Sequence, residues 1–420
     1  MSTQSLRQLI TVLRGCLRGG NHTRALRLLV TNLPRTEGHY LLRRSVAEIL
    51  LDMGRTREAL EIYEILVRHF TNSGHPLLAI IVAHRLAEHE PNIHSHFDHL
   101  SRVYGNGSPF LDPSVQMLPL PDPPASARID LNGADPQEPL EILIERAHGL
   151  ATLKDNFAAV PDKVPPIPLL SLLDVRTLRT LIELLRPASF VEEATIFGPD
   201  RPLKAPLFVA NGDLRLTTDD KHQTVSTGAL IGHRTILGLP NPTGAIVGVA
   251  LSPVEALTLD DDTLPMVQGD ASIRQTVEGF DQACLIDKAI DRSGIFSKIP
   301  VDHREELIGM MEGLALRDNT TLIHQGQNSD GLYLIVDGRI DVNKRDGEWD
   351  VTFRTMEIGE VIGEISLVTE GPAVASVVTD GPARALFIKA SDVMRICERF
   401  PAVMAELRES AAKRLLSREA

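Results

Sequence analysis

Cysteine, aromatic residues and long apolar runs are all scarce in this sequence of 420 residues. The three cysteines, Cys16, Cys284 and Cys397, lie far apart and in no CxxC or Cys/His zinc spacing. This excludes a disulfide framework and a zinc finger, and predicts reduced thiols in a cytoplasmic protein. Aromatic residues make up 4% of the chain, so its cores must be aliphatic. No stretch approaches about 18 uninterrupted apolar residues, and arginines interrupt the N-terminal apolar runs, which argues against membrane insertion and a secretory signal.

Positive charge is also in short supply and is unevenly distributed. The formal net charge of −13 argues against nucleic acid as a partner, because nucleic-acid binding needs a basic surface. Residues 1–105 differ from the rest, since they hold 13 Arg, no Lys and 9 Asp or Glu and sum to +4. The remaining chain therefore carries −17. This asymmetry predicts an acidic partner for the front, or contact between the front and the rear.

Residues 1–105 have the apolar spacing of helices, with steps of three and four residues. GNHTRALRLL from Gly20 and GRTREALEIY from Gly54 begin 34 residues apart, with Ala25 and Ala59 at the same offset. This period and these small residues resemble tetratricopeptide repeats, which implies a helical surface that binds a protein partner. An ordinary helical bundle is the alternative.

Residues 106–168 are predicted to be a linker that carries one helix. The stretch 109–168 contains 12 of the 27 prolines, and LPLPDPPAS and VPPIP cannot form a helix or a central strand. Between them, PLEILIERAHGLATL has helical spacing, with Pro139 at its start.

From about residue 169 the apolar period changes to two. LFVANGDLRLTTDD and TLIHQGQNSDGLYLIVDGRIDVNKRDG both have the pattern of strand, turn and strand. Matching residues recur in order at a separation that drifts from 126 to 131: Leu207–Val209 and Gly212 with Tyr333–Ile335 and Gly338, Ile196 with Ile323, Pro253 with Pro382, Ala256 and Leu257 with Ala385 and Leu386, and Gly232 with Gly363. A duplicated domain with small loop insertions gives this pattern. We expect the two copies at 169–285 and 286–420.

Two small β barrels flanked by helices resemble the cyclic nucleotide-binding domain family, whose fold is a jelly roll with a short phosphate-binding turn. The second copy carries the ordered features of that family: Ile323, Gln325-Gly326, Ser329-Asp330, Tyr333–Ile335, Gly338, Ile340, Gly359, the IGEISL turn, Pro372 and Ala375. The implied fold class is a multidomain α+β chain, in which a helical repeat precedes two jelly rolls.

In this family the turn resembles GE-x-x-L followed by PR-[ST]-A. The resemblance implies that helix-end N–H groups and the Arg hold a cyclic phosphate, and that the Glu takes the ribose hydroxyl. The candidate ligand-binding turn here comprises Gly363, Glu364, Ile365, Ser366, Ala373, Val374 and Ala375. Ala373 stands at the Arg place and Val374 at the hydroxyl place, which should cost roughly one to three decades of affinity. Glu364 is then either a ribose ligand or a structural cap of the turn.

The first copy departs further from the family pattern. Its turn begins at Gly232, but His233 stands at the Glu place and, after one inserted residue, Thr243 stands at the Arg place. Arg234 is nearby. We expect that this copy does not bind a cyclic nucleotide in the family's way.

Signatures of catalysis are missing. The β regions offer only His222, His233 and His324, without HxH spacing, and the chain has no GxSxG, P-loop or CxxC pattern. No catalytic residue, metal or resident cofactor is expected. In the histidine-rich segment 89–99, His96 and His99 are spaced to share a helix face, but a solvated helix end is the better reading than a metal site.

These observations predict a non-enzymatic, cytoplasmic signalling or scaffolding protein. Its helical front would bind a protein, and its tandem cyclic nucleotide-binding-like domains would lack the phosphate contact. A cyclic-nucleotide receptor that binds cAMP or cGMP in the second copy, at least weakly, is the alternative. A metal-dependent jelly-roll enzyme is the third interpretation. No helix–turn–helix pattern follows the second copy before Ala420, so we do not expect a transcription regulator.

Overall fold

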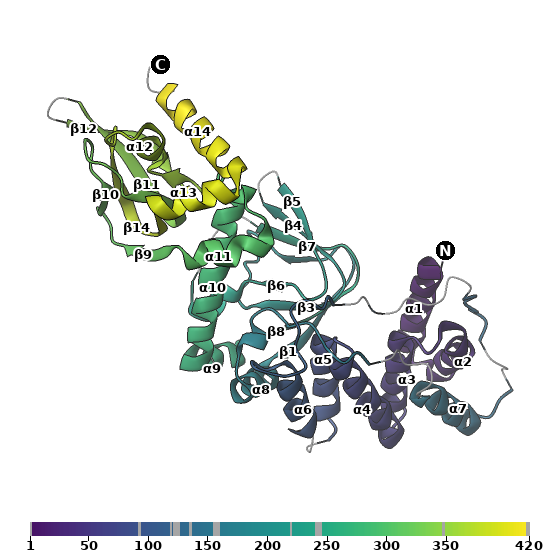
Figure 1. Cartoon of the computed structure of the whole chain (residues 1–420). Helices are drawn as coiled ribbons and strands as arrows, with labels where there is room; N and C mark the ends of the chain where they lie inside the picture. Colours follow the sequence, from purple (N-terminus) through teal and green to yellow (C-terminus); the bar gives the residue numbers. More distant parts are fainter. Residues whose placement is uncertain are drawn as a thin grey trace. The chain divides into compact units, whose positions relative to one another are not determined.

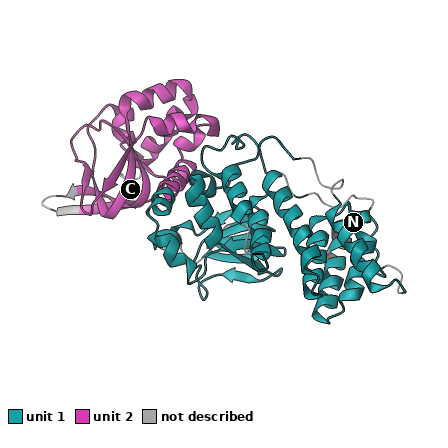
Figure 2. Ribbon diagram, turned by 90° about the horizontal axis from the view of Figure 1, so that it is seen from below, with its two compact units in different colours: residues 1–278 teal, residues 279–420 magenta. Residues whose placement is uncertain are grey.

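The computed structural model divides into two compact units, residues 1–278 and 279–420 (Figure 2). It describes residues 2–90, 94–117, 120, 127–133, 137–153, 160–218, 221–239, 246–346 and 349–416. The helix α10 (Ala271–Arg292) spans the boundary between the units. The division into four segments at 105, 168 and 285 remains a prediction.

The first unit opens with six α-helices (Figure 1). They are α1 (Ser2–Arg18), α2 (His22–Asn32), α3 (Tyr40–Asp52), α4 (Thr56–Asn72), α5 (Pro76–Ala87) and α6 (His94–Tyr104), with the short 3-10 helix η1 (Pro34–Thr36) before α3. Their apolar faces pack together, and both predicted contact residues, Ala25 and Ala59, are fully buried. The helical character of the front is therefore confirmed.

The helix turns at Gly20 and Gly54 have the same hydrogen bonds, 34 residues apart. Gly20 and Gly54 have φ of 66° and 76°, a conformation in which a Cβ is strained. The amide of Asn21 donates to Cys16 O at 2.8 Å, and that of Arg55 donates to Leu50 O at 2.7 Å. The sequence match therefore marks a repeated local geometry, while membership of the tetratricopeptide class remains a proposal.

The predicted linker helix is α7 (Leu140–Thr152), which follows Pro139 at the N-cap position and packs on α2, α3 and α4. Arg43 of α3, fully buried, helps to hold its end. The guanidinium donates to the carbonyl oxygens of Ala151 at 2.5 Å and Leu153 at 3.0 Å. The Arg43 side chain thus supplies hydrogen-bond donors to carbonyl oxygens at the C-terminal end of α7, which have no partner within the helix.

The rest of the first unit is a two-sheet β domain between helices. Its sheets have the strand orders β1-β8-β3-β6 and β2-β7-β4-β5. The elements in chain order are η3 (Leu170–Leu172), α8 (Val175–Leu184), β1 (Arg186–Phe190), β2 (Thr195–Phe197), β3 (Leu207–Asn211), β4 (Leu214–Thr218), β5 (Lys221–Val225), β6 (Leu230–Ile231), η4 (His233–Leu237), β7 (Ile246–Ala250), β8 (Val254–Thr258) and α9 (Thr263–Gly269). The inward side chains are mainly aliphatic, as the low aromatic content predicts.

The second unit is built around one six-stranded sheet, in which β10-β14-β11-β12 form the main path, β13 pairs with β11 and β9 pairs with β14. After α10, its elements are η5 (Phe296–Lys298), η6 (Val301–His303), α11 (Arg304–Gly309), β9 (Glu312–Leu316), β10 (Thr321–Ile323), β11 (Gly331–Asp346), β12 (Trp349–Met356), β13 (Val361–Ile362), α12 (Glu364–Thr369), β14 (Ser376–Lys389), α13 (Ala390–Arg399) and α14 (Pro401–Leu416).

Strand pairing follows the same scheme in the two β regions. Phe208 of β3 pairs with Leu257 of β8, and Leu334 of β11 pairs with Leu386 of β14, which are the residues that the sequence match aligns. β6 and β13 likewise pair with β3 and β11. The segments 207–216 and 333–342 thus occupy corresponding strands.

Helical spacing misplaces one boundary before the second β region. The segment 302–314, DHREELIGMMEGL, has helical spacing throughout, but α11 stops at Gly309 and Glu312–Leu316 forms β9, which pairs with β14. Pairing with a buried strand overrides the local helical spacing there. The helices α9 and α10 follow the first β region, where the sequence analysis gave no helix boundaries.

Candidate functional site

The predicted turn of the second unit has the expected local structure. β13 ends at Ile362, Gly363 follows with φ of 97°, and α12 begins at Glu364. A Cβ at Gly363 would lie 2.5 Å from the carbonyl oxygen of Gly331, so both the backbone conformation and the space require glycine. The sharp turn directs Glu364 and Ser366 inward, where both are buried.

A cavity of about 140 Å³ lies beside this turn. Its described wall includes all seven predicted residues: Gly363, Glu364, Ile365, Ser366, Ala373, Val374 and Ala375. The remaining wall comes from β10, β11, β12, β13, β14 and α14, and it is apolar apart from Lys344, Arg354 and Arg414. A cavity of about 150 Å³ is known to hold one benzene molecule, so this one has room for a single ring rather than a whole nucleotide.

Glu364 is held by a residue of the last helix. Arg414 of α14 donates through Nη1 to Glu364 Oε1 at 2.7 Å and to Val361 O at 2.6 Å. The Glu364 side chain is only 3% exposed, while that of Arg414 is 21% exposed. Arg414 also lies 3.6 Å from Glu360 Oε1, which Arg354 contacts as well. Glu364 is therefore the buried end of a charge network, and not a cap for the N–H groups of its own turn.

Sequence reasoning missed Arg414. Among the other arginines of the second unit, Arg339 of β11 points to Asp380 at 3.4 Å, and its side chain is 59% exposed. The pairing partner stands 50 residues after Glu364, on a helix whose orientation no local pattern specifies. The one available signal was that a buried carboxylate needs a cationic partner somewhere in the chain.

The place of the family arginine is part of the apolar wall. Ala373 is buried with Ile323, Met356 and Ile362 in one aliphatic cluster. Its amide donates to Gln327 O at 2.7 Å and its carbonyl accepts from the Gly326 amide at 2.7 Å, which fixes the backbone. Within the described part of the wall, the cations are Lys344, Arg354 and Arg414, and the two arginines contact carboxylates.

The corresponding turn of the first unit is built differently. Gly232 has φ of 74° and precedes η4, so the glycine keeps its role, but His233 begins a 3-10 helix where the second unit has Glu364. Gln268 of α9 donates to Thr235 O at 2.9 Å and braces this turn from outside. Thr243 lies outside the described residues.

The histidine-rich segment does not form a shared cluster in the described residues. His94 lies 3.6 Å from Glu183, and His99 lies 3.0 Å from Asn72 Oδ1. Burial lowers the pKa of His96 and of His99. Among the residues that the structure describes, no group of three His, Cys, Asp or Glu side chains is arranged to hold a metal ion.

Comparison with known families agrees with the fold of the second unit. Residues 314–400 match the family model of the cyclic nucleotide-binding domain. The match lies within the second unit and supports a fold of the cyclic nucleotide-binding type for this part of the chain. A search of curated proteins found no match.

Solved structures with a similar chain course are distant. They include the regulatory domain of Toxoplasma gondii PKA with cAMP, 18% identical over 58% of this chain and 92% of that chain, with a TM-score of 0.28. A mutant regulatory subunit of a cAMP-independent protein kinase A from Trypanosoma brucei, bound to cAMP, is 18% identical over 60% and 92%, with a TM-score of 0.29. The catabolite activator protein of Thermus thermophilus is 23% identical over 30% and 60%, with a TM-score of 0.29. At such scores these similarities carry no argument about ligands.

A search of the described helices for a membrane span found none of sufficient length and apolarity.

Proposed function

We propose that this chain is a non-enzymatic regulatory or scaffolding protein, in which the cyclic nucleotide-binding-type domain has lost the family's phosphate contact. The observation that carries the proposal is the pairing of Glu364 with Arg414, together with alanine at position 373. Glu364, which the resemblance assigns to the ribose, already pairs with Arg414 of the same chain. Ala373, at the position that the resemblance assigns to the phosphate-binding arginine, has only a methyl group.

The energetic consequence follows from burial. A cyclic phosphate in this cavity would lose its hydration without gaining the charge-assisted hydrogen bonds of an arginine, each worth about 1.5–3 kcal/mol. At about 1.4 kcal/mol per decade, the loss is roughly one to two decades of affinity for each bond. The size of the cavity adds a further cost, because its walls must move to admit a nucleotide.

A receptor for a cyclic nucleotide is the second candidate. What favours it is the buried carboxylate of Glu364 on the cavity wall, which matches the family position for the ribose contact. In this reading Arg414 orients the carboxylate rather than blocking it. The two candidate functions predict different affinities for cAMP and cGMP.

Calorimetric titration of the full chain with cAMP and cGMP separates them. We expect weak or no binding by the wild type, and measurable binding by the double variant Ala373→Arg with Val374→Ser, because the phosphate charge would again be paired. Glu364→Ala in that background should remove the gain. The control is Arg339→Ala, whose side chain is exposed and paired outside the cavity.

Two outcomes count against the proposal. Tight binding of cAMP by the wild type would establish the receptor, and its loss on replacing Arg414 would identify that residue as the compensating cation. No gain in the folded double variant would mean that the cavity is filled by its own side chains, so that the domain is a protein-contact module alone.

We further propose that residues 169–285 form a second domain of this type that has lost ligand binding, and that residues 1–105 bind a protein partner. The equivalent pairing of Phe208 and Leu334 supports the first statement. The charge of +4 on the front supports the second, because it favours a partner segment that carries carboxylates. A cytoplasmic location and the tetratricopeptide class belong to the same proposal.

A further inference from the structure

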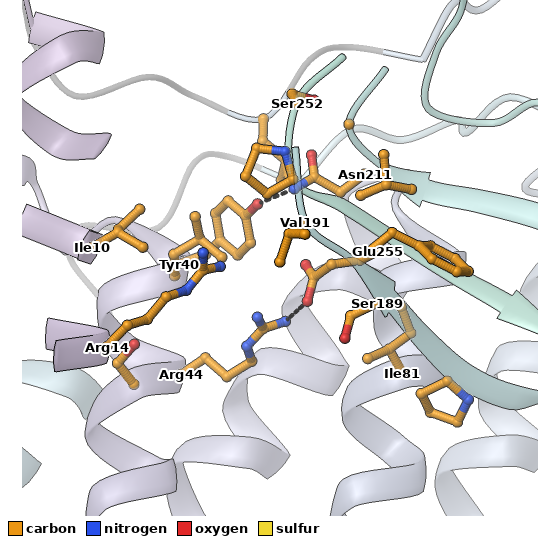
Figure 3. A pocket seen from close by; sticks show the side chains of 18 of the residues that line it. Ile10, Arg14, Tyr40, Arg44, Ile81, Ser189, Val191, Asn211, Ser252 and Glu255 are labelled. Atoms are coloured by element: carbon orange, nitrogen blue, oxygen red, sulfur yellow. Dashed lines mark hydrogen bonds and ion pairs between the residues drawn. The ribbon is translucent and has the colours of Figure 1, made fainter. Parts of the chain in front are cut away.

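A groove of about 1170 Å³ lies inside the first unit, between its helices and its β domain (Figure 3). One wall comes from α1, α3 and α5, and the other from β1 and the turns beside β4 and β8. Two polar contacts cross it: Asn211 Nδ2 donates to Tyr40 Oη at 3.0 Å, and Arg44 Nη1 lies 2.6 Å from Glu255 Oε1. Small-molecule sites usually measure about 300–1,000 Å³, so this groove suits a longer occupant.

The two walls carry opposite charge. The helical wall presents four arginines and one glutamate, a formal +3, and the β wall presents two glutamates and one aspartate, a formal −3. The helical set is Arg14, Arg18, Arg44, Arg85 and Glu48, and the β set is Glu192, Asp213 and Glu255. A segment of one charge sign would meet attraction on one wall and repulsion on the other.

Part of this charge is neutralised within the protein. Arg44 pairs with Glu255 and Glu48, and Arg85 pairs with Glu88.

The remaining charges are Arg14 and Arg18 on one wall, and Glu192 and Asp213 on the other. None of the four forms an ion pair with another residue in the described part of the chain. Both arginines are exposed and stand one helical turn apart on α1, so they share a face. Val191, beside Glu192, is 64% exposed and adds an apolar contact point.

We propose that this groove binds an extended protein segment in which acidic and basic side chains alternate. Successive side chains of an extended chain point to opposite sides. Such a segment directs its carboxylates to Arg14 and Arg18, and its cations to Glu192 and Asp213. The inference rests on the proposal that the front of the chain binds protein, and it specifies the surface and the chemistry of the partner.

The test uses the full chain and a fluorescent octapeptide in which glutamate and lysine alternate, with fluorescence anisotropy as the readout. The reference is a peptide of the same composition with four glutamates followed by four lysines. We expect about tenfold tighter binding of the alternating peptide at low salt, since two weak ion pairs with the peptide on each wall, four in all, add up to about one decade. The preference should fade as salt is added.

Reversal of the walls gives the sharpest outcome. Arg14→Glu with Arg18→Glu should weaken binding of the alternating peptide about tenfold, and Glu192→Lys with Asp213→Lys should weaken it to the same extent. The variant with all four changes should recover the affinity, because the peptide can slide by one residue and exchange its two faces.

Matched controls are Arg57→Glu and Glu193→Lys, which reverse exposed charges that do not line the groove and should leave binding unchanged. Equal binding of both peptides by the wild type would overturn the inference. So would failure of the fourfold variant to recover while its circular dichroism is native. Tighter binding of an all-glutamate peptide, unaffected by reversal of the β wall, would identify a purely acidic partner instead.

The broader proposal of protein binding is tested separately by cross-linking the full chain in a lysate. If a partner is captured equally by the wild type and by the variants with one wall reversed, the groove is not its binding site. The proposal that the front binds a protein would remain. Absence of any cross-linked partner would count against both.

Discussion

The pairing of Arg414 with Glu364 makes a quantitative prediction for the second unit. Arg414→Met removes the cation but keeps most of the side-chain length, and leaves a carboxylate that is 3% exposed without its partner. Breaking a buried pair in this way costs about 3–5 kcal/mol. Because Arg414 is itself 21% exposed, water replaces part of the contact, and we expect a loss of about 2–3 kcal/mol in unfolding free energy.

A double-mutant cycle isolates the interaction itself. Glu364→Gln should cost about 1–2 kcal/mol, because an amide oxygen can still accept from Arg414. The double variant should be less destabilised than the sum of the single ones by about 1–2 kcal/mol, since removal of both charges leaves no buried charge without a partner. Lys413→Met is the control, because Lys413 is 74% exposed and pairs with the exposed Glu409. It should lie within about 0.5 kcal/mol of the wild type.

The assay can address this unit alone. Trp349 is the only tryptophan of the chain and belongs to β12 of the second unit. Urea unfolding of the full chain, followed by tryptophan fluorescence, therefore reports on that unit. Faster amide hydrogen exchange in α12 and α14 of the Arg414 variant would locate the effect. If Arg414→Met behaves like Lys413→Met, the ion pair has no energetic role and the reasoning fails.

Three further predictions concern the rest of the molecule. Ala59→Trp should overpack a fully buried helix contact and lower stability by about 1–3 kcal/mol, whereas Arg57→Trp on the exposed side should not, as thermal unfolding would report. Burial and neighbouring cationic groups lower the pKa of His69 to about 4, so the unfolded chain takes up a proton first as the pH falls below 6.5. Stability should then decrease from pH 6.5 towards pH 4 by up to about 3 kcal/mol, and His69→Gln should flatten this dependence. Gly338→Ala should be more destabilising than Gly381→Ala in urea titrations, because both have positive φ but only the first Cβ meets a carbonyl oxygen, at 2.6 Å.

Much of the strand arrangement could be predicted from the sequence, because duplication makes one copy a guide to the other. Gly212 and Gly338 match in sequence, and each has positive φ and a backbone carbonyl within 2.6 Å of the place of its Cβ. Glycine is the residue that satisfies both conditions, so the match reflects backbone geometry. The turn at Gly363 was predictable for the same reason.

The completion of the site could not be predicted, because it depends on the path of a distant helix. Helical spacing in 401–416 identifies α14 but does not say which carboxylate its Arg414 will reach. Likewise, the backbone bonds that fix Ala373 come from Gly326 and Gln327, which stand more than forty residues earlier in the chain. Interactions between segments so far apart leave no periodic trace in either one.

The position of Arg414 on the last helix has a thermodynamic consequence. A ligand that binds the Glu364 carboxylate in place of Arg414 must weaken the binding of α14 to the domain. By linkage, a protein that detaches α14 must raise the affinity of that ligand for Glu364 by the same factor. An interaction of about 2–3 kcal/mol corresponds to a factor of about 30 to 150 in each direction. Equal factors measured from the two sides would be the signature of this linkage. A domain with no strong affinity for a nucleotide would then still couple an event at Glu364 to the position of α14. Arg414 would occupy the contact that the resemblance assigns to a bound nucleotide.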